Sequence, residues 1–143
     1  MCAALELNET RLRPGQLVAV WTARGALRVV WAGFARRESL RWWKQQGGEL
    51  VDIPAHRFAE RSDRDRQLRW DQLPPGHVIR GLLAPAAARD GDPLLKVVTR
   101  PSTPEELARY EHDRMPVLEI PLRSAEIIPV PAPGRPAQAE LFG

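Results

Sequence analysis

The chain is short of cysteine and of long apolar runs, and each shortage excludes a class of protein. Its 143 residues include one cysteine, Cys2, so an internal disulfide and a cysteine-rich zinc site are both excluded. No apolar run approaches the roughly 18–20 residues of a membrane span. The first residues, MCAALELNETRLR, lack the basic and apolar regions of a signal peptide. The sequence therefore predicts a soluble intracellular protein.

Arginine is the residue that this chain has in quantity. The formal net charge is only +3, but 19 of the 21 basic residues are arginine and the isoelectric point is near 9.7. The planar guanidinium group donates two parallel hydrogen bonds to a phosphate and also stacks on bases. Five tryptophans add flat faces for unpaired bases. This composition indicates a nucleic-acid partner, and a GC-rich genome explains it equally well.

Short segments rich in β-branched and aromatic residues follow one another along the chain. We expect strands over residues 16–22, 26–34, 49–53, 77–83, 94–100, 117–120 and 125–130. Helices are expected over residues 36–46 and after the capping sequence Ser102-Thr103-Pro104. Residues 57–72 are very polar and indicate a loop or a short exposed helix. The sequence thus predicts a compact α+β domain over residues 1–130, mostly antiparallel, and an extended proline-rich tail over residues 131–143.

Cys2 directly follows the initiator methionine. Removal of that methionine leaves a thiol and an α-amine on one residue, and an unperturbed α-amine titrates at roughly pH 7.7–8.0. Such a residue is a nucleophile near neutral pH, and with an aldehyde it closes a thiazolidine ring. An inert cysteine that merely follows Met1 fits the same sequence.

A second candidate for chemistry is the histidine in Glu111-His112-Asp113-Arg114-Met115-Pro116. This segment joins the expected capped helix to a strand, so His112 lies at a corner where it can relay protons near neutral pH. A surface histidine in a charged corner fits equally well. The other histidines, His56 and His77, do not have metal-site spacing with His112, so we expect neither a metal nor a cofactor.

Residues 94–121 contain the motif HDRMP and resemble the last part of the sequences of the SOS-response-associated peptidase (SRAP) family. Members of that family also begin Met-Cys, and RLRPGQLVAVW and RVVWAGFA resemble its earlier strands. The resemblance implies a DNA damage response protein that binds single-stranded or junction DNA and shields abasic sites by a thiazolidine crosslink. It implies that Cys2 is the nucleophile, that His112 assists ring opening, and that candidate DNA contacts are Arg57, Arg114 and Trp42 or Trp43.

The chain departs from the family pattern at two positions. Residues 53–60, which align with the family's NARxET segment, lack its asparagine. Where the family has an acid beside the cysteine, this chain has Ile79, an apolar side chain that cannot transfer a proton. Glu60 and His77 are the possible substitutes, and we take Glu60 as the third catalytic candidate. If the covalent chemistry has been lost, the protein is a non-catalytic DNA- and clamp-binding adaptor on the same scaffold. A small β-rich binding protein unrelated to the family is a third interpretation, and lyase or peptidase activity is left open.

The C-terminal tail carries a separate motif. Gln138-Ala139-Glu140-Leu141-Phe142 resembles the Q-x-x-L-F peptide with which bacterial repair and replication proteins bind the sliding clamp. In such a peptide Leu141 and Phe142 enter an apolar pocket and Gln138 forms hydrogen bonds at its rim. The resulting expectation is a monomer in the cytoplasm, associated with the nucleoid, that binds the clamp through residues 138–142.

Overall fold

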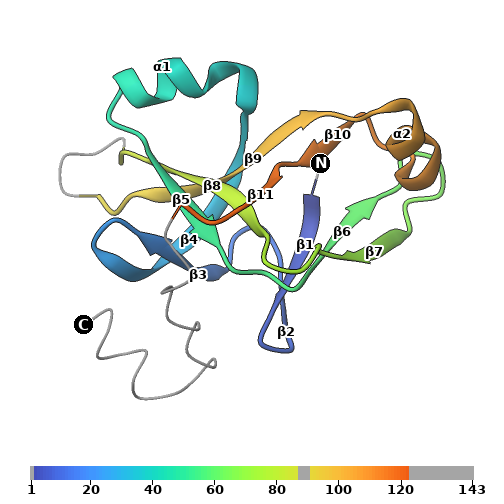
Figure 1. Cartoon of the computed structure of the whole chain (residues 1–143), viewed down its shortest axis with the longest axis horizontal. Coiled ribbons are helices and arrows are strands. Elements are labelled where there is room, and N and C mark those ends of the chain that lie inside the picture. The colour runs from blue at the N-terminus through green and yellow to red at the C-terminus, as the bar shows by residue number, and fades with distance from the viewer. Residues whose placement is uncertain (1, 87–90, 123–143) are drawn as a thin grey trace.

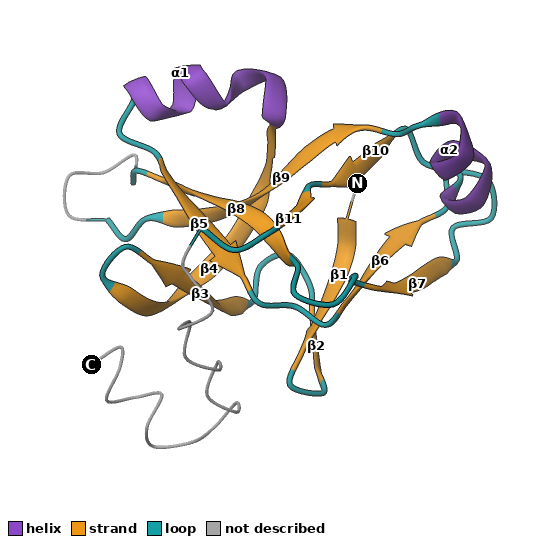
Figure 2. Ribbon diagram, in the orientation of Figure 1, coloured by secondary structure: helices purple, strands orange, loops and turns teal. Residues whose placement is uncertain are grey.

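The structure is a computed structural model that describes residues 2–86 and 91–122, and it contains two β-sheets and two short α-helices (Figures 1 and 2). The strands are β1 (Cys2–Leu7), β2 (Thr10–Leu12), β3 (Leu17–Thr22), β4 (Gly25–Arg36), β5 (Glu49–Ile53), β6 (Arg57–Arg61), β7 (Leu68–Gln72), β8 (Val78–Ala84), β9 (Leu94–Pro101), β10 (Arg114–Pro116) and β11 (Leu118–Glu119). The helices are α1 (Leu40–Gln45), preceded by a 3₁₀ turn over Arg37–Ser39, and α2 (Pro104–Tyr110).

Five strands of the larger sheet pair in a closed ring. The ring order is β3, β4, β9, β8 and β5, and β5 pairs with β3 again. All of these pairs are antiparallel except β4 with β9. The interior is tightly filled, because a Cβ atom at Gly81 of β8 would lie 2.9 Å from side-chain atoms of both Val51 and Leu95. Glycine at this position therefore lets three strands approach one another closely.

The smaller sheet has the order β2-β1-β6-β7, and all of its pairs are antiparallel. In the pairing of β1 with β6, Leu5 lies opposite Phe58, and both side chains are buried in the main core. Tyr110 at the end of α2 and Met115 of β10 belong to the same core. The chain's first strand is therefore an interior element, and its beginning lies beside β10 (Figure 1).

Both helices begin and end for reasons that are visible in their sequences. At the start of α2, the Thr103 hydroxyl accepts the Glu106 N–H and the Glu106 carboxylate accepts the Thr103 N–H, which is a complete capping box. Helix α1 ends just before Gly47, which has φ +92°. Leu40 and Trp43 of α1 pack against a second core cluster, which consists of Ala35, Leu82, Val98 and Val117.

The structure confirms the predicted α+β class with mostly antiparallel strands and two helices. The expectation for residues 57–72 is wrong, because they form the paired strands β6 and β7. Phe58 and Ala59 are buried there, and strand pairing satisfies the backbone of a segment whose side chains are mostly charged. The single strand expected over residues 117–120 is replaced by β10 and β11, which pair with different strands. Residues 125–130 and the tail lie outside the described residues.

A buried arginine attaches the end of the described chain to the ring. Arg80 of β8 is 1% exposed, and its Nη1 donates to Asp52 Oδ1 at 2.5 Å and to the Val51 carbonyl at 2.8 Å. Its Nε donates to Glu119 at 2.9 Å and its Nη2 to the Ile120 carbonyl at 3.2 Å. One guanidinium group therefore ties β5 and β8 to the segment that follows β10.

We expect Asp52→Asn to lower the free energy of unfolding by about 3–5 kcal/mol, because it leaves the buried Arg80 charge without its closest counter-charge. The matched control is Glu119→Gln, which removes a partner of Arg80 whose side chain is 45% exposed. That variant should cost less than about 1 kcal/mol. Urea unfolding measures both values, and equal losses in the two variants would contradict a dominant role for the buried pair.

Candidate functional site

Strand pairing brings Cys2 and Glu60 together. The two residues are partners in the β1–β6 register, just before an irregularity in the pairing between Cys2 and Ala4. Both residues are fully buried. The Cys2 Sγ donates to the Ala4 carbonyl at 3.5 Å. Two of the three catalytic candidates from the sequence, 58 positions apart, therefore lie side by side.

Burial controls the charge of both groups. Removal from water raises the pKa of Glu60 to about 7, and the negative charge of Asp63 also raises it. Burial likewise raises the pKa of the Cys2 thiol well above its usual value, and the neighbouring Glu60 carboxylate adds to the effect. At neutral pH the thiol therefore holds its proton, whereas the Glu60 carboxyl is divided between its acid and base forms. A carboxyl that titrates near neutral pH is suited to proton transfer.

His112 lies in the loop between α2 and β10, and the charge of Asp63 acts on both His112 and Glu60. Its carbonyl accepts the Ser102 hydroxyl at 2.7 Å, and its Nδ1 accepts the Arg114 N–H at 3.1 Å. The neutral ring therefore carries its proton on Nε2, which is 3.9 Å from Asp63 Oδ1. Asp63 also acts electrostatically on Glu60. Burial lowers the pKa of His112, so the ring is mostly neutral at pH 7.

A pocket of about 440 Å³ opens beside His112. It is lined by side chains of both charges and by one aromatic ring. The lining residues are Phe34, Arg36, Asp63, Thr99, His112, Asp113 and Arg114. A polar pocket of this size has room for a sugar-phosphate unit and contains both hydrogen-bond donors and acceptors.

Of the residues expected to bind DNA, Arg114 alone lines this pocket. Its guanidinium group already has partners within the protein. Its guanidinium contacts Glu38 through two hydrogen bonds of 2.9 and 3.2 Å and donates to the Thr99 carbonyl at 2.8 Å. Arg57 lies at the other end of β6 from Glu60. There it contacts Glu6 and lies 5.0 Å from the Trp70 ring centroid. The structure thus gives Arg114 and Arg57 intramolecular partners.

The two tryptophans of α1 have different environments. Trp43 packs against the second core cluster, and its ring lies 5.7 Å from the Lys96 ammonium. Trp42 is 53% exposed and meets Trp43 edge to face, with the ring centroids 4.9 Å apart. Of the pair, Trp42 has the side chain available for stacking on a base. The tail candidates Gln138, Leu141 and Phe142 lie outside the described residues.

Sequence reasoning missed Asp63 and Arg36. Asp63 is one of several acids in an arginine-rich run, and nothing in that run distinguishes it from Asp65. Arg36 is the first of two adjacent arginines, and its place in the sequence indicates only the start of the helix expected over residues 36–46. In the structure it ends β4 at the pocket, with an exposed side chain and no ion pair to another described residue.

Three possible ligand atoms, from Asp63, His112 and Asp113, lie within 4.8 Å of one another. Two features oppose a cation at this point. The Nδ1 of His112 already accepts a backbone N–H, and the guanidinium groups of Arg36 and Arg114 line the same pocket. We therefore do not assign a metal site to these residues.

No family model matches this chain, and neither the curated proteins nor the solved structures contain a significant match to it. Function is therefore argued from the chain's own residues. Among the residues that the structure describes, no helix is long and apolar enough to cross a membrane.

We expect Glu60 to make stability depend on pH. Its pKa of about 7 in the folded protein lies above the value of 4.5 for a free carboxyl, so ionisation opposes folding. The free energy of unfolding should therefore fall as the pH rises from about 4.5 to 7, by roughly 3 kcal/mol from this group. Glu60→Gln should remove that part of the decrease, and the exposed control Glu105→Gln should retain it. Urea unfolding at pH 5 and pH 8 measures the difference, and equal pH dependence in Glu60→Gln and wild type would contradict the burial of this acid.

Proposed function

We propose that the protein binds single-stranded or junction DNA and shields abasic sites by forming a thiazolidine crosslink through Cys2. The observation that carries this proposal is the pairing of Cys2 with Glu60, a buried carboxyl whose pKa is about 7. Asp63, which lines the pocket with His112, also acts electrostatically on Glu60. The resemblance of the HDRMP segment to the SRAP family indicates the same chemistry.

The reaction needs no group beyond the protein and the DNA. After Met1 is removed, the α-amine of Cys2 adds to the aldehyde carbon of the ring-opened sugar and gives a carbinolamine. Loss of water then forms an imine. The Cys2 thiol adds across the C=N bond, so that a C–S bond forms and the nitrogen regains a proton. One aldehyde and one aminothiol thus give one thiazolidine and one water molecule.

Glu60 and His112 have suitable properties for the proton transfers in this sequence. The carbinolamine oxygen must gain a proton before it leaves as water, and an acid with a pKa of about 7 can supply one at neutral pH. The same carboxylate can then take the proton of the Cys2 thiol as the ring closes. The carboxylate form of Glu60 can also accept the proton that the attacking amine loses, and the Nε2–H of His112 can donate a hydrogen bond to the sugar oxygen as the sugar ring opens.

DNA would reach this chemistry across the pocket and the exposed face of α1. Arg36 at the pocket is available for a phosphate contact, because its side chain is exposed and makes no ion pair with a described residue. The exposed ring of Trp42 offers a stacking surface for an unpaired base. Arg114 is bound to Glu38 and Thr99, so it would form part of the pocket wall and would not bind the DNA strand.

A non-catalytic adaptor on the same scaffold is the second candidate function. It is favoured by one observation, the complete burial of the Cys2 side chain within the main core cluster. A cysteine with that environment and a raised pKa also serves as an ordinary packing residue. In that case Arg36 and Trp42 would still bind DNA, and no covalent bond would form.

The processed protein should form a denaturation-resistant adduct with single-stranded DNA that contains an abasic site, and none with intact DNA. Cys2→Ser should lose most of this adduct, because a serine hydroxyl closes a much less stable ring than a thiol. Denaturing gel electrophoresis measures the adduct, and mass spectrometry first establishes that Met1 has been removed. Equal adduct yields for the two proteins would exclude the thiol mechanism.

The same samples distinguish the two candidate functions. Fluorescence anisotropy with intact single-stranded DNA reports binding without chemistry, and Cys2→Ser should bind as wild type does. If both proteins bind DNA and neither forms an adduct, the adaptor is the correct function. If wild type neither binds nor crosslinks, both candidate functions are wrong.

We also propose that residues 138–142 bind the bacterial sliding clamp. The support is the Q-x-x-L-F pattern, which follows a proline-rich segment in the sequence. Proline-rich linkers in general act as semi-rigid spacers. Two apolar anchors, each contributing about 1.5–3 kcal/mol, are consistent with micromolar affinity after the cost of ordering the peptide. An interaction of that strength suits transient recruitment to replication forks, where single strands carry abasic sites.

Alanine at both Leu141 and Phe142 should abolish clamp binding while abasic-site crosslinking stays at the wild-type level. The control replaces Pro131 and Pro133 with alanine, which changes the spacer but keeps both anchors. Isothermal titration calorimetry against the purified clamp measures a dissociation constant of about 1 μM or weaker for wild type. Unchanged binding by the double anchor variant would show that the pattern is accidental.

A further inference from the structure

The smaller sheet has an inner face against the core and an outer face on the opposite side. On the inner face, Phe58 of β6 packs against Tyr110 of α2, with the ring centroids 6.0 Å apart. Side chains alternate along a strand and register partners share a face, so the pairing of the four strands defines the outer face. Its charged and aromatic residues are Glu6, Arg11, Arg57, Arg61 and Trp70. Three arginines against one glutamate give this face an excess of positive charge.

Side chains from both edges of the sheet meet above its middle. Arg11 of β2 and Trp70 of β7 are separated by β1 and β6, which is a distance of about 14 Å between the two edge strands. The Cζ of Arg11 nevertheless lies 4.8 Å from the centroid of the Trp70 ring. The outward residues of the middle strands there are Ala4 and Ala59, which are 2% and 0% exposed. Their small side chains leave room for a stack of larger groups over the sheet.

Two further residues fix this stack. The Cζ of Arg57 lies 5.0 Å from the centroid of the same Trp70 ring. One oxygen of Glu6 lies 3.5 Å from Arg11 Nε and 3.7 Å from Arg57 Nη1, so a single carboxylate serves both arginines. The side chain of Arg11 is 62% exposed and that of Arg57 is 32% exposed. Arg11 is therefore the member of the stack that presents a flat cation to solvent.

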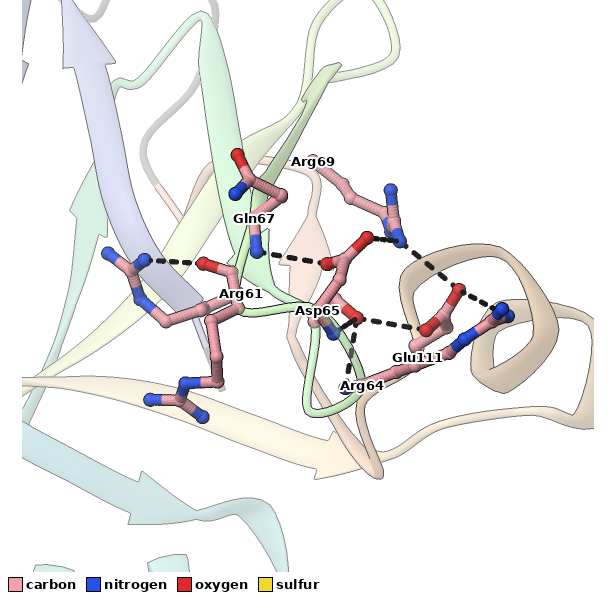
Figure 3. A network of polar contacts seen from close by, with 8 residues as sticks. Arg61, Arg64, Asp65, Gln67, Arg69 and Glu111 are labelled. Atoms are coloured by element: carbon pink, nitrogen blue, oxygen red, sulfur yellow. Dashed lines mark hydrogen bonds and ion pairs between the residues drawn. The ribbon is translucent and has the colours of Figure 1, made fainter.

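Arg61 places a further positive charge on the outer face, about 13 Å along β6 from Arg57. Its Nη1 donates to the Arg66 carbonyl at 2.7 Å, and it forms no ion pair with another residue that the structure describes. Arg69, in contrast, contacts Glu111 at 3.1 Å on the other side of the turn. Figure 3 shows the guanidinium of Arg61 pointing away from Glu111. The charge of Arg61 is thus not neutralised by the acids of this turn.

We propose that the outer face of the smaller sheet binds single-stranded DNA, with an unpaired base stacked on Arg11 and a phosphate bound by Arg61. Trp70, Arg57 and Glu6 act as positioning residues for Arg11. A guanidinium plane that lies on an aromatic ring can stack equally on a base, and a base placed there extends the stack by one layer. A phosphate is the ligand that suits a guanidinium with no acidic partner.

The chemistry of the stack selects the partner. An acidic peptide would use the charge of the arginines and leave their planar faces unused. The bases of a duplex are already stacked on one another, whereas those of a single strand have free faces. None of the residues that line the pocket of about 440 Å³ lies on this face, so the surface is separate from that pocket. The identity of the strand as DNA rests on the proposed function.

We expect Arg61→Gln to weaken binding of a fluorescein-labelled oligothymidylate about fivefold at about 0.1 M salt. Loss of one phosphate contact should also reduce the slope of log affinity against log salt by about 0.7. Arg61→Lys should restore both values. Fluorescence anisotropy measures them, and equal urea-unfolding midpoints establish that the variants are folded.

Arg11→Lys tests the stack, because it keeps the charge and removes the planar group. It should weaken binding about two- to fivefold and leave the salt dependence unchanged. The matched control is Arg24→Lys, together with Arg24→Gln for the charge change. Arg24 is an exposed arginine whose Nη2 lies 3.6 Å from Glu49, and the structure describes no aromatic ring beneath it. Both control variants should bind as wild type does.

Wild-type affinity in Arg61→Gln and Arg11→Lys would overturn the surface, as would equal losses in the Arg24 variants. Competition by polyglutamate as effective as that by unlabelled strand, or equally tight binding of a duplex, would also overturn it. If the variants weaken binding as expected and wild type forms no adduct with abasic DNA, this surface stands and the crosslinking function fails. If wild type forms the adduct and the variants bind the intact strand normally, the proposed function stands and this surface is overturned. If wild type binds no single strand, both fail.

Discussion

The position of the candidate site depends on the buried guanidinium of Arg80. The segment that carries His112 continues through β10 and β11, which are short and pair with β9 and β8. Arg80 adds a further attachment, because it binds Asp52 on one side and Glu119 with the Ile120 carbonyl on the other. Its backbone N–H also donates to the Val117 carbonyl. A buried ion pair contributes little net stability, but it penalises any arrangement that separates the partners. We infer that this constraint fixes where the His112 loop meets the smaller sheet.

The burial that stabilises the core also creates the unusual electrostatics of the site. Cys2 and Glu60 occupy interior positions of a sheet whose neighbouring interior residues are apolar, such as Leu5 and Phe58. Ionisation of Glu60 at that position is unfavourable because the charge is removed from water, and its pKa is therefore raised to about 7. A valine or leucine at position 60 would fit the strand pattern better than glutamate does. Departures of this kind from the local rule are typical of functional positions.

The sequence was sufficient for elements whose signals are local and insufficient for those that depend on distant partners. The capping box of α2 and the β3–β4 hairpin were predicted because their residues act on neighbours a few positions away. Strands β6 and β7 were missed because charged residues are frequent in the segment that contains them. The pairing of β6 with β1, and of β7 with β6, makes them strands rather than their composition. The same limit applies to the site. Cys2, Glu60 and His112 were found as residue types, but the place of Asp63 in the pocket follows only from the turn between β6 and β7.

The buried thiol and the proposed nucleophile are compatible when the order of the steps is considered. Attack on the aldehyde is made by the α-amine, which is a backbone group at the end of β1, so the thiol need not be ionised at that stage. Once the imine exists, the Cys2 sulfur is attached to the reacting nitrogen through three bonds, N–Cα, Cα–Cβ and Cβ–Sγ. Closure of the ring is then intramolecular, where effective concentrations far exceed those of free thiols. The thiol proton has an acceptor in Glu60, the register partner of Cys2. Burial then protects the thiol from oxidation until an imine forms, since thiolate character and exposure set that sensitivity. A crosslinking protein that must wait for a rare lesion gains from such an arrangement.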